Sequence, residues 1–184
     1  MTELRDAESP AGLARFAKLA PMSTISELRR ILGTCRTIAV MGLSPQWHRP
    51  SFFAAKYMQE HGFRIVPVNP SAPEILGQRS WPSVSAAAEG LAAQGIRIDM
   101  VDCFRRSADI PPIAQEAIAI GARCLWLQIG VLDEASAAKA RAAGLDVVMD
   151  RCVKIEHARL YGGLGWAGVD TKVISARRPQ QLFY

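Results

Sequence analysis

Short, β-branched apolar runs recur along the middle of the chain. Stretches with helix-like spacing of apolar residues separate them. Continuous apolar strands that alternate with amphipathic helices indicate a parallel sheet that is covered on both faces. The predicted strands are residues 37–41, 64–68, 98–103, 123–129 and 145–149.

Helical spacing predicts the elements between these strands and one element before them. The stretch "STISELRRILGTC" begins with capping residues, and Gly33 is a plausible stop, so we expect a lead-in helix there. Its apolar positions are Ile25, Leu28, Ile31 and Leu32. The other predicted helices are residues 51–61, roughly 83–93, 110–120 and 133–143.

This order of elements predicts an α/β fold with a doubly wound, three-layer arrangement. Right-handed crossovers favour a five-stranded parallel sheet in the order 3-2-1-4-5. We expect residues 1–22 to form an N-terminal tail and residues 23–160 to form the domain. The Gly-rich residues 161–184 are too few for a second domain, so we expect a C-terminal arm.

Composition narrows the class of protein. An apolar share of 49% and a charged share of 21% over 184 residues are typical of a soluble globular protein. No apolar run approaches a membrane span, and the acidic start "MTELRDAESP" is unlike a signal peptide, so we expect a cytoplasmic protein. The four cysteines contain no CxxC pair, which predicts free thiols.

The net charge of +5 is modest, and its distribution says more than its size. Basic residues occur in short groups rather than in a stripe interleaved with aromatics, which argues against a nucleic-acid interface. Arginine pairs in loops suit a small polyanionic ligand, because a guanidinium grips a phosphate through two parallel hydrogen bonds. The groups are Arg29-Arg30, Arg105-Arg106, Arg151 with Lys154, and Arg177-Arg178.

In an open parallel sheet, ligands bind at the carboxyl ends of the strands, near the point where the winding reverses. The first such loop is "MGLSPQWHRPSF". Gly42 permits a tight turn, Ser44 offers a hydroxyl and Ser51 can cap the following helix, whose start attracts an anion that Arg49 completes. The alternative is that Gly42 merely turns the chain and Ser51 merely caps.

The second loop, "PVNPSAPEILGQ", has three prolines and is therefore stiff. Asn69 stands where NAD-binding proteins usually place an acid that grips the ribose, and GxGxxG is absent, which counts against NAD. A contact role for Asn69 and a rigid connection with Gly77 at a turn both remain open.

The third loop offers an aromatic surface with two arginines, and the fourth loop offers a polar side chain. In "CFRRSADIPP", Phe104 can stack on a base while Arg105 and Arg106 pair with phosphate, although an arginine pair is often a solvated surface feature. In "LWLQIGV", Gln128 is a polar group and Gly130 permits close approach.

The fifth segment, "MDRCVKIEHARL", gathers Asp150, Cys152, Glu156 and His157. Its spacing supports neither a metal site nor a Cys–His nucleophile strongly, and we predict no metal and no catalytic residue. A nearby Arg151 or Lys154 can lower the pKa of Cys152 and make it a reactive thiolate, to which we assign no reaction.

Five ordered motifs resemble the small stand-alone CoA-binding domain proteins, which are similar to the nucleotide-binding domain of the succinyl-CoA synthetase α subunit. The motifs are "TIAVMGLSPQWHRPSFFAAKYMQEHGFRIVPVNP", "EILGQ", "DMVDCFRR", "AIAIGARCLWLQIGV" and "AGLDVVMDRCVKIEHARL". The resemblance runs from about residue 24 to residue 160 and implies a Rossmann-like domain that binds coenzyme A, generally without a demonstrated reaction.

The resemblance also implies site residues. The family's phosphate loop falls on Gly42, Ser44, Arg49 and Ser51, its second loop on Val68, Asn69 and Pro70 with Ile75 and Gly77, its adenine-side wall on Phe104, Arg105 and Arg106, and its fourth-strand contacts on Gln128 and Gly130. The family's "DRC" and "K" fall on Asp150, Arg151, Cys152 and Lys154, without an assigned role.

The expected function is therefore binding of coenzyme A or an acyl-CoA, without a catalytic step. The alternatives are an NADP-linked oxidoreductase, a CoA-dependent transferase subunit, or a subunit of a larger assembly, homo-oligomeric or with a partner protein, that docks through the C-terminal arm. We expect neither nucleic acid nor a membrane as partner. The thiol of coenzyme A also raises the hypothesis of a mixed disulfide with Cys152.

Overall fold

Five parallel strands form the centre of the molecule in a computed structural model that describes residues 23–161. Every strand that the apolar runs predict is present, and the α/β doubly wound class is confirmed. The predicted tail, residues 1–22, and residues 162–184 of the predicted arm lie outside the described residues. The strands are β1 (Thr37–Met41), β2 (Arg64–Val68), β5 (Met100–Cys103), β6 (Cys124–Leu127) and β7 (Asp146–Val148).

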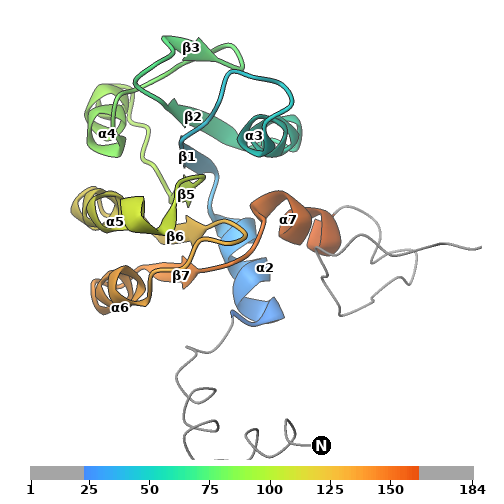
Figure 1. Cartoon of the computed structure of the whole chain (residues 1–184), viewed down its shortest axis with the longest axis vertical. Helices are drawn as coiled ribbons and strands as arrows, with labels where there is room; N and C mark the ends of the chain where they lie inside the picture. The colour runs from blue at the N-terminus through green and yellow to red at the C-terminus, as the bar shows by residue number, and fades with distance from the viewer. Residues whose placement is uncertain (1–22, 162–184) are drawn as a thin grey trace, which may run out of the picture.

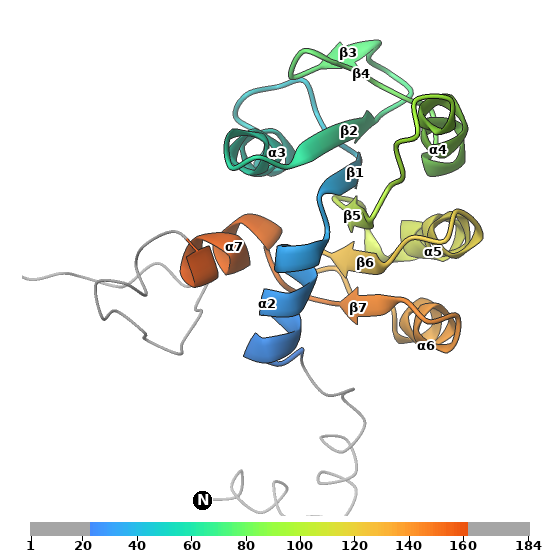
Figure 2. The ribbon, with the colours of Figure 1, turned by 180° about the vertical axis from the view of Figure 1, so that it is seen from behind.

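Helices cover both faces of this sheet, so the molecule has three layers (Figure 1). All of the predicted helices form, and the last helix of the described residues is one that was not predicted. The helices are α2 (Ile25–Thr34), α3 (Pro50–Glu60), α4 (Val84–Ala92), α5 (Ile110–Ala119, after the short turn η2, Ser107–Asp109), α6 (Glu134–Ala142) and α7 (Val153–Tyr161). The view from behind shows the same division, with α4, α5 and α6 on one face and α2, α3 and α7 on the other (Figure 2).

The strand order corrects the predicted order 3-2-1-4-5. The observed order is β2-β1-β5-β6-β7, which is 2-1-3-4-5 when the strands of this sheet are counted along the chain. In this order β5 pairs with β1, and β2 lies at the edge. Pro67 gives the physical reason, because a proline has no N–H for a central ladder and favours an edge strand. Its carbonyl accepts a hydrogen bond from the Trp81 N–H on the side away from β1.

A short hairpin and one helix were not predicted. Residues 74–79 form a hairpin of β3 (Glu74–Ile75) and β4 (Gln78–Arg79). Its turn residues Leu76 and Gly77 have φ values of 55° and 69°, so Gly77 does lie in a turn. The helix α7 covers most of the fifth segment, for which no helix was predicted.

The two faces of the sheet carry two separate cores, because successive strand residues point to opposite sides. Val101 and Leu125 pack under α4, α5 and α6. Met100 and Trp126 pack under α2, α3 and α7. Asp102, two residues after Met100, therefore points to the same face as Met100, and this buried acid lies just before the end of its strand.

Candidate functional site

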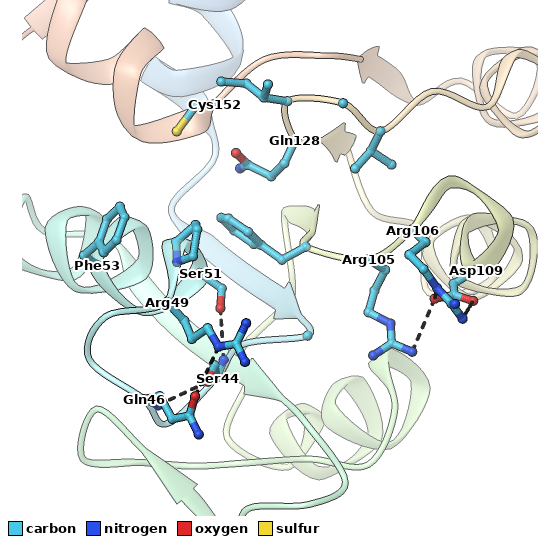
Figure 3. Close-up of a pocket in the computed structure, with 16 residues that line it drawn as sticks. Ser44, Gln46, Arg49, Ser51, Phe53, Arg105, Arg106, Asp109, Gln128 and Cys152 are labelled. Atoms are coloured by element: carbon cyan, nitrogen blue, oxygen red, sulfur yellow. Dashed lines mark hydrogen bonds and ion pairs between the residues drawn. The ribbon is translucent and has the colours of Figure 1, made fainter. Parts of the chain in front are cut away.

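A pocket of about 1020 Å³ opens where the carboxyl ends of β1, β5 and β6 meet (Figure 3). This is the point at which the chain reverses its winding, between β1 and β5, where doubly wound proteins bind ligands. Most of the predicted site residues line it, namely Gly42, Ser44, Arg49, Ser51, Phe104, Arg105, Arg106, Gln128, Gly130 and Cys152. The lining residues that the sequence did not suggest are Gln46, Pro50, Phe53, Asp109, Ile129 and Val131.

The predicted residues of the second loop do not line this pocket. The Val68 carbonyl accepts the Gly42 N–H at 2.9 Å, and the Asn69 amide donates to the Leu43 carbonyl at 2.8 Å. The second loop therefore stabilises the first loop through these two hydrogen bonds and does not line the pocket itself.

The other predicted residues outside the pocket have separate surroundings. Ile75 is buried in the core, Pro70 is exposed, and Gly77 lies at the hairpin turn. Lys154 also lies off the pocket, with Nζ 5.4 Å from the centre of the Phe53 ring.

Hydrogen bonds hold the first loop against the start of α3. The buried Ser51 hydroxyl accepts the Ser44 N–H at 3.1 Å, so Ser51 does not cap the helix as the sequence suggested. The N-cap residue is Arg49, followed by Pro50, and no side chain caps the helix. Arg49 donates from Nε to the Gln46 amide oxygen at 3.1 Å. The amino end of α3 thus reaches the pocket with its backbone dipole uncompensated by a capping group.

Position 42 requires a glycine for two reasons, a positive φ and the close approach of the Phe104 backbone. The φ of Gly42 is +82°, and a Cβ there would lie 2.6 Å from the Phe104 carbonyl oxygen. Its N–H is already donated to Val68, so it is not free for a ligand. The role of Gly42 is therefore to let the loops after β1 and β5 meet.

The arginines after β5 share one carboxylate. Asp109 lies 3.4 Å from Arg105 Nη2 and 3.3 Å from Arg106 Nε, and these cations hold the pKa of Asp109 below its ordinary value. Both arginines are exposed, with 48% and 85% of their side-chain surface accessible. Ion pairs this exposed are weak, so an incoming anion can compete with Asp109 for both guanidinium groups.

Gln128 is fixed by an acid that the sequence analysis did not single out. Its Nε2 donates to Oδ1 of Asp102 at 2.7 Å, and both side chains are buried. Burial raises the pKa of Asp102 to about 7, against the lowering effect of the Gln128 hydrogen bond. The sequence feature that could have identified Asp102 is its position within the apolar run "MVDC", because an acidic residue is rarely buried in a strand without a function or a partner.

The fifth segment holds separate structures rather than one reactive cluster. Glu156 is buried between Arg151 and Arg159, at 2.8 and 2.5 Å. His157 Nδ1 lies 3.2 Å from the Tyr57 hydroxyl. The described residues contain no group of three or more His, Cys, Asp or Glu side chains arranged to hold a metal ion.

The structure does not support a reactive thiolate at Cys152. Burial raises the pKa of Cys152, and this outweighs the backbone N–H groups at the start of α7 and the nearby charge of Lys154. Cys152 is half-buried, whereas Cys35, Cys103 and Cys124 are fully buried, and none of the four forms a disulfide. Cys152 is thus the pocket's thiol, held mainly in its protonated form at neutral pH.

Comparison with known proteins places the chain in a family. A family model for the CoA binding domain matches residues 36–158. The chain belongs to the CoA binding domain family. It is 36% identical over 133 residues to the uncharacterized protein YneT of Bacillus subtilis (strain 168), covering 72% of this chain and 93% of that protein.

Solved structures agree with this membership. The chain superimposes on Prb, a protein redesigned for binding, with a TM-score of 0.72 and 34% identity, over 78% of this chain and 96% of Prb. A hypothetical protein from Pyrococcus horikoshii OT3 gives a TM-score of 0.69 and 32% identity, over 78% of this chain and 98% of that protein.

In the described residues, no helix is long and apolar enough to cross a membrane.

Proposed function

We propose that this chain binds coenzyme A or an acyl-CoA in the pocket at the carboxyl ends of β1, β5 and β6. One observation carries the proposal. The uncapped amino end of α3 and the arginines of two loops line a single pocket at the reversal of the sheet. Membership of the CoA binding domain family supports the same ligand.

The phosphate groups of coenzyme A match the positive groups of the pocket. The amino end of a helix carries a partial positive charge that attracts an anion. Arg49 lies at this helix start, and Arg105 and Arg106 lie across the pocket, where Asp109 is a weakly held competitor. Two phosphate clusters, the pyrophosphate and the 3′-phosphate, would use both sets of cations.

The remaining parts of the ligand match the apolar and polar walls. Phe104 and Phe53 line the pocket with ring surface on which an adenine or the pantetheine arm can pack. Gln128 adds an amide for the polar groups of the arm. In this proposal the protein has the role of holding the ligand, without a catalytic step. His157 does not line the pocket and lies within hydrogen-bond distance of the Tyr57 hydroxyl, and burial raises the pKa of Cys152.

Calorimetric titration with coenzyme A, acetyl-CoA, NAD and NADP tests the proposal. We expect both CoA compounds to bind, and we expect Arg49→Ala and Arg105→Ala each to weaken binding by about 1.5–3 kcal/mol for a lost charged hydrogen bond. Asp109→Asn removes the competing carboxylate and should tighten binding. Arg29→Ala, an exposed position on α2, is the matched loss of charge and should leave binding unchanged.

Other outcomes favour the alternatives. Tight binding of NADP without binding of coenzyme A would replace the proposal with an NADP-linked oxidoreductase. Transfer of an acetyl group from acetyl-CoA to an acceptor during the titration would point to a CoA-dependent transferase subunit instead.

A further inference from the structure

The pair of Asp102 and Gln128 joins the buried core to the pocket. Asp102 lies on the central strand β5, opposite Val40 of β1 and Trp126 of β6, and only 2% of its surface is exposed. It does not line the pocket. Gln128 follows β6 and does line it, and Figure 3 shows its side chain among the other lining residues. A buried carboxyl group outside the pocket lining therefore holds a side chain that lines the pocket.

Asp102 has no cation beside it among the described residues. Its pKa is raised by burial and is opposed only by the Gln128 hydrogen bond. The basic groups on this face are engaged elsewhere, since Arg151 pairs with Glu156 and Lys154 lies over the Phe53 and Tyr57 rings. The carboxyl is therefore free to gain or lose a proton without breaking an ion pair.

The other titratable groups that interact electrostatically with Asp102 are thiols. Cys103 is its neighbour on β5, Cys124 lies on β6, and Cys152 precedes α7. Burial raises the pKa of all of these thiols above the ordinary value for cysteine, so they stay neutral near pH 7. His157 on α7 titrates separately, with a pKa lowered by burial and by His61.

We infer that Asp102 sets the hydrogen-bonding polarity of the pocket wall by fixing which end of the Gln128 amide faces the ligand. With Asp102 ionised, its carboxylate accepts from Gln128 Nε2, as observed, which leaves the amide oxygen for a ligand donor. With Asp102 protonated, its O–H donates to the Gln128 oxygen, the amide turns, and the NH₂ group faces the cavity. The proton comes from solvent, and no other bond changes.

This inference rests on the proposed function for the identity of the ligand. The pantetheine arm of coenzyme A carries two amide groups and ends in a thiol, and one of its N–H or S–H donors is assigned to the Gln128 oxygen. The ionised state of Asp102 should therefore favour the ligand, and the protonated state should place a donor against a donor. The geometry makes Asp102 a positioning residue for recognition of the arm.

The pH dependence of ligand affinity tests this role. Dephospho-CoA is the better ligand, because it lacks the 3′-phosphate of coenzyme A, whose own titration falls near neutral pH. Calorimetry from about pH 5.5 to about pH 8.5 should show about tenfold tighter binding by the parent protein at the higher pH, the effect of one hydrogen bond. Asp102→Asn, which cannot ionise, should lack this component, while the exposed Glu89→Gln should keep it.

The unliganded protein gives a second measurement that is independent of the ligand. The side-chain amide resonances of Gln128 should shift with a midpoint near pH 7 in the parent protein and stay constant in Asp102→Asn. Constant resonances in the parent protein, or equal affinity profiles for parent and Asp102→Asn, would overturn the inference. Absence of binding by both CoA compounds at every pH would overturn the proposed function instead, while the resonances would still decide the role of Asp102.

Discussion

The Cys152 thiol lies on the pocket wall and has a raised pKa, which decides how it should react. A mixed disulfide forms when the Cys152 thiolate attacks one sulfur of CoA disulfide and expels the other half as CoA thiolate. Because the thiolate fraction is small at neutral pH, we expect slow formation at about pH 7 and a rate several-fold higher at about pH 9. Intact-protein mass spectrometry over time measures the adduct.

The matched control for this reaction is Cys152→Ser, which should show no CoA-sized adduct because the other thiols are buried. A rate at about pH 7 equal to the rate at about pH 9 would contradict the raised pKa of Cys152. No adduct at either pH would contradict the hypothesis of a mixed disulfide.

Residue types identified chemical character better than they identified roles. Arg49, Arg105 and Ser51 do line the pocket. Yet Ser51 braces the loop instead of capping the helix, and a nearby lysine was a poor guide to the pKa of Cys152. Such roles depend on hydrogen bonds and on burial, and both require the position of neighbours that are remote in the sequence.

At the scale of elements, the site depends on contact between the loop after β1 and the loop after β5. Gly42→Ala would force a side chain to within 2.6 Å of the Phe104 carbonyl, in addition to the cost of a positive φ. We expect a loss of about 2–4 kcal/mol in the free energy of unfolding, and weaker binding of coenzyme A. Urea denaturation with calorimetry measures both effects.

Gly144→Ala separates the two costs in this prediction. Gly144 has φ +90° with open space around its Cβ position, so the substitution should cost only about 1–2 kcal/mol, from the backbone alone. Equal losses for the two variants would show that the loops do not need the close approach at Gly42.

The strands of the sheet could be predicted from the sequence, but the order in which they pair could not. Apolar runs and helical spacing depend on local burial, and they located every strand and the helices from α2 to α6. The order of the strands depends on pairing between distant residues, and the one local clue was Pro67 in β2. The hairpin around Gly77 has strands of two residues, too short for a periodic pattern to reveal.

For the whole molecule, the buried Asp102 links stability to pH. Its carboxyl has a pKa near 3.8 in an unfolded chain and about 7 in the folded protein. Between these values the folded state binds more protons, so this group lowers the free energy of unfolding as pH rises to about 7, and the loss persists above it. Asp102→Asn should remove this contribution, whereas the depressed pKa of His157 acts equally in both proteins and cancels in the comparison.

Chemical denaturation at about pH 5 and about pH 8 measures this contribution. Relative to Asp102→Asn, the parent protein should lose about 2–3 kcal/mol between the two pH values. Glu89→Gln, with an exposed carboxylate, should behave like the parent. The same pH dependence in the parent protein and in Asp102→Asn would mean that Asp102 keeps one protonation state in the folded protein between about pH 5 and about pH 8. In that case the Gln128 amide would not change its orientation over this range, which contradicts the inferred role of Asp102.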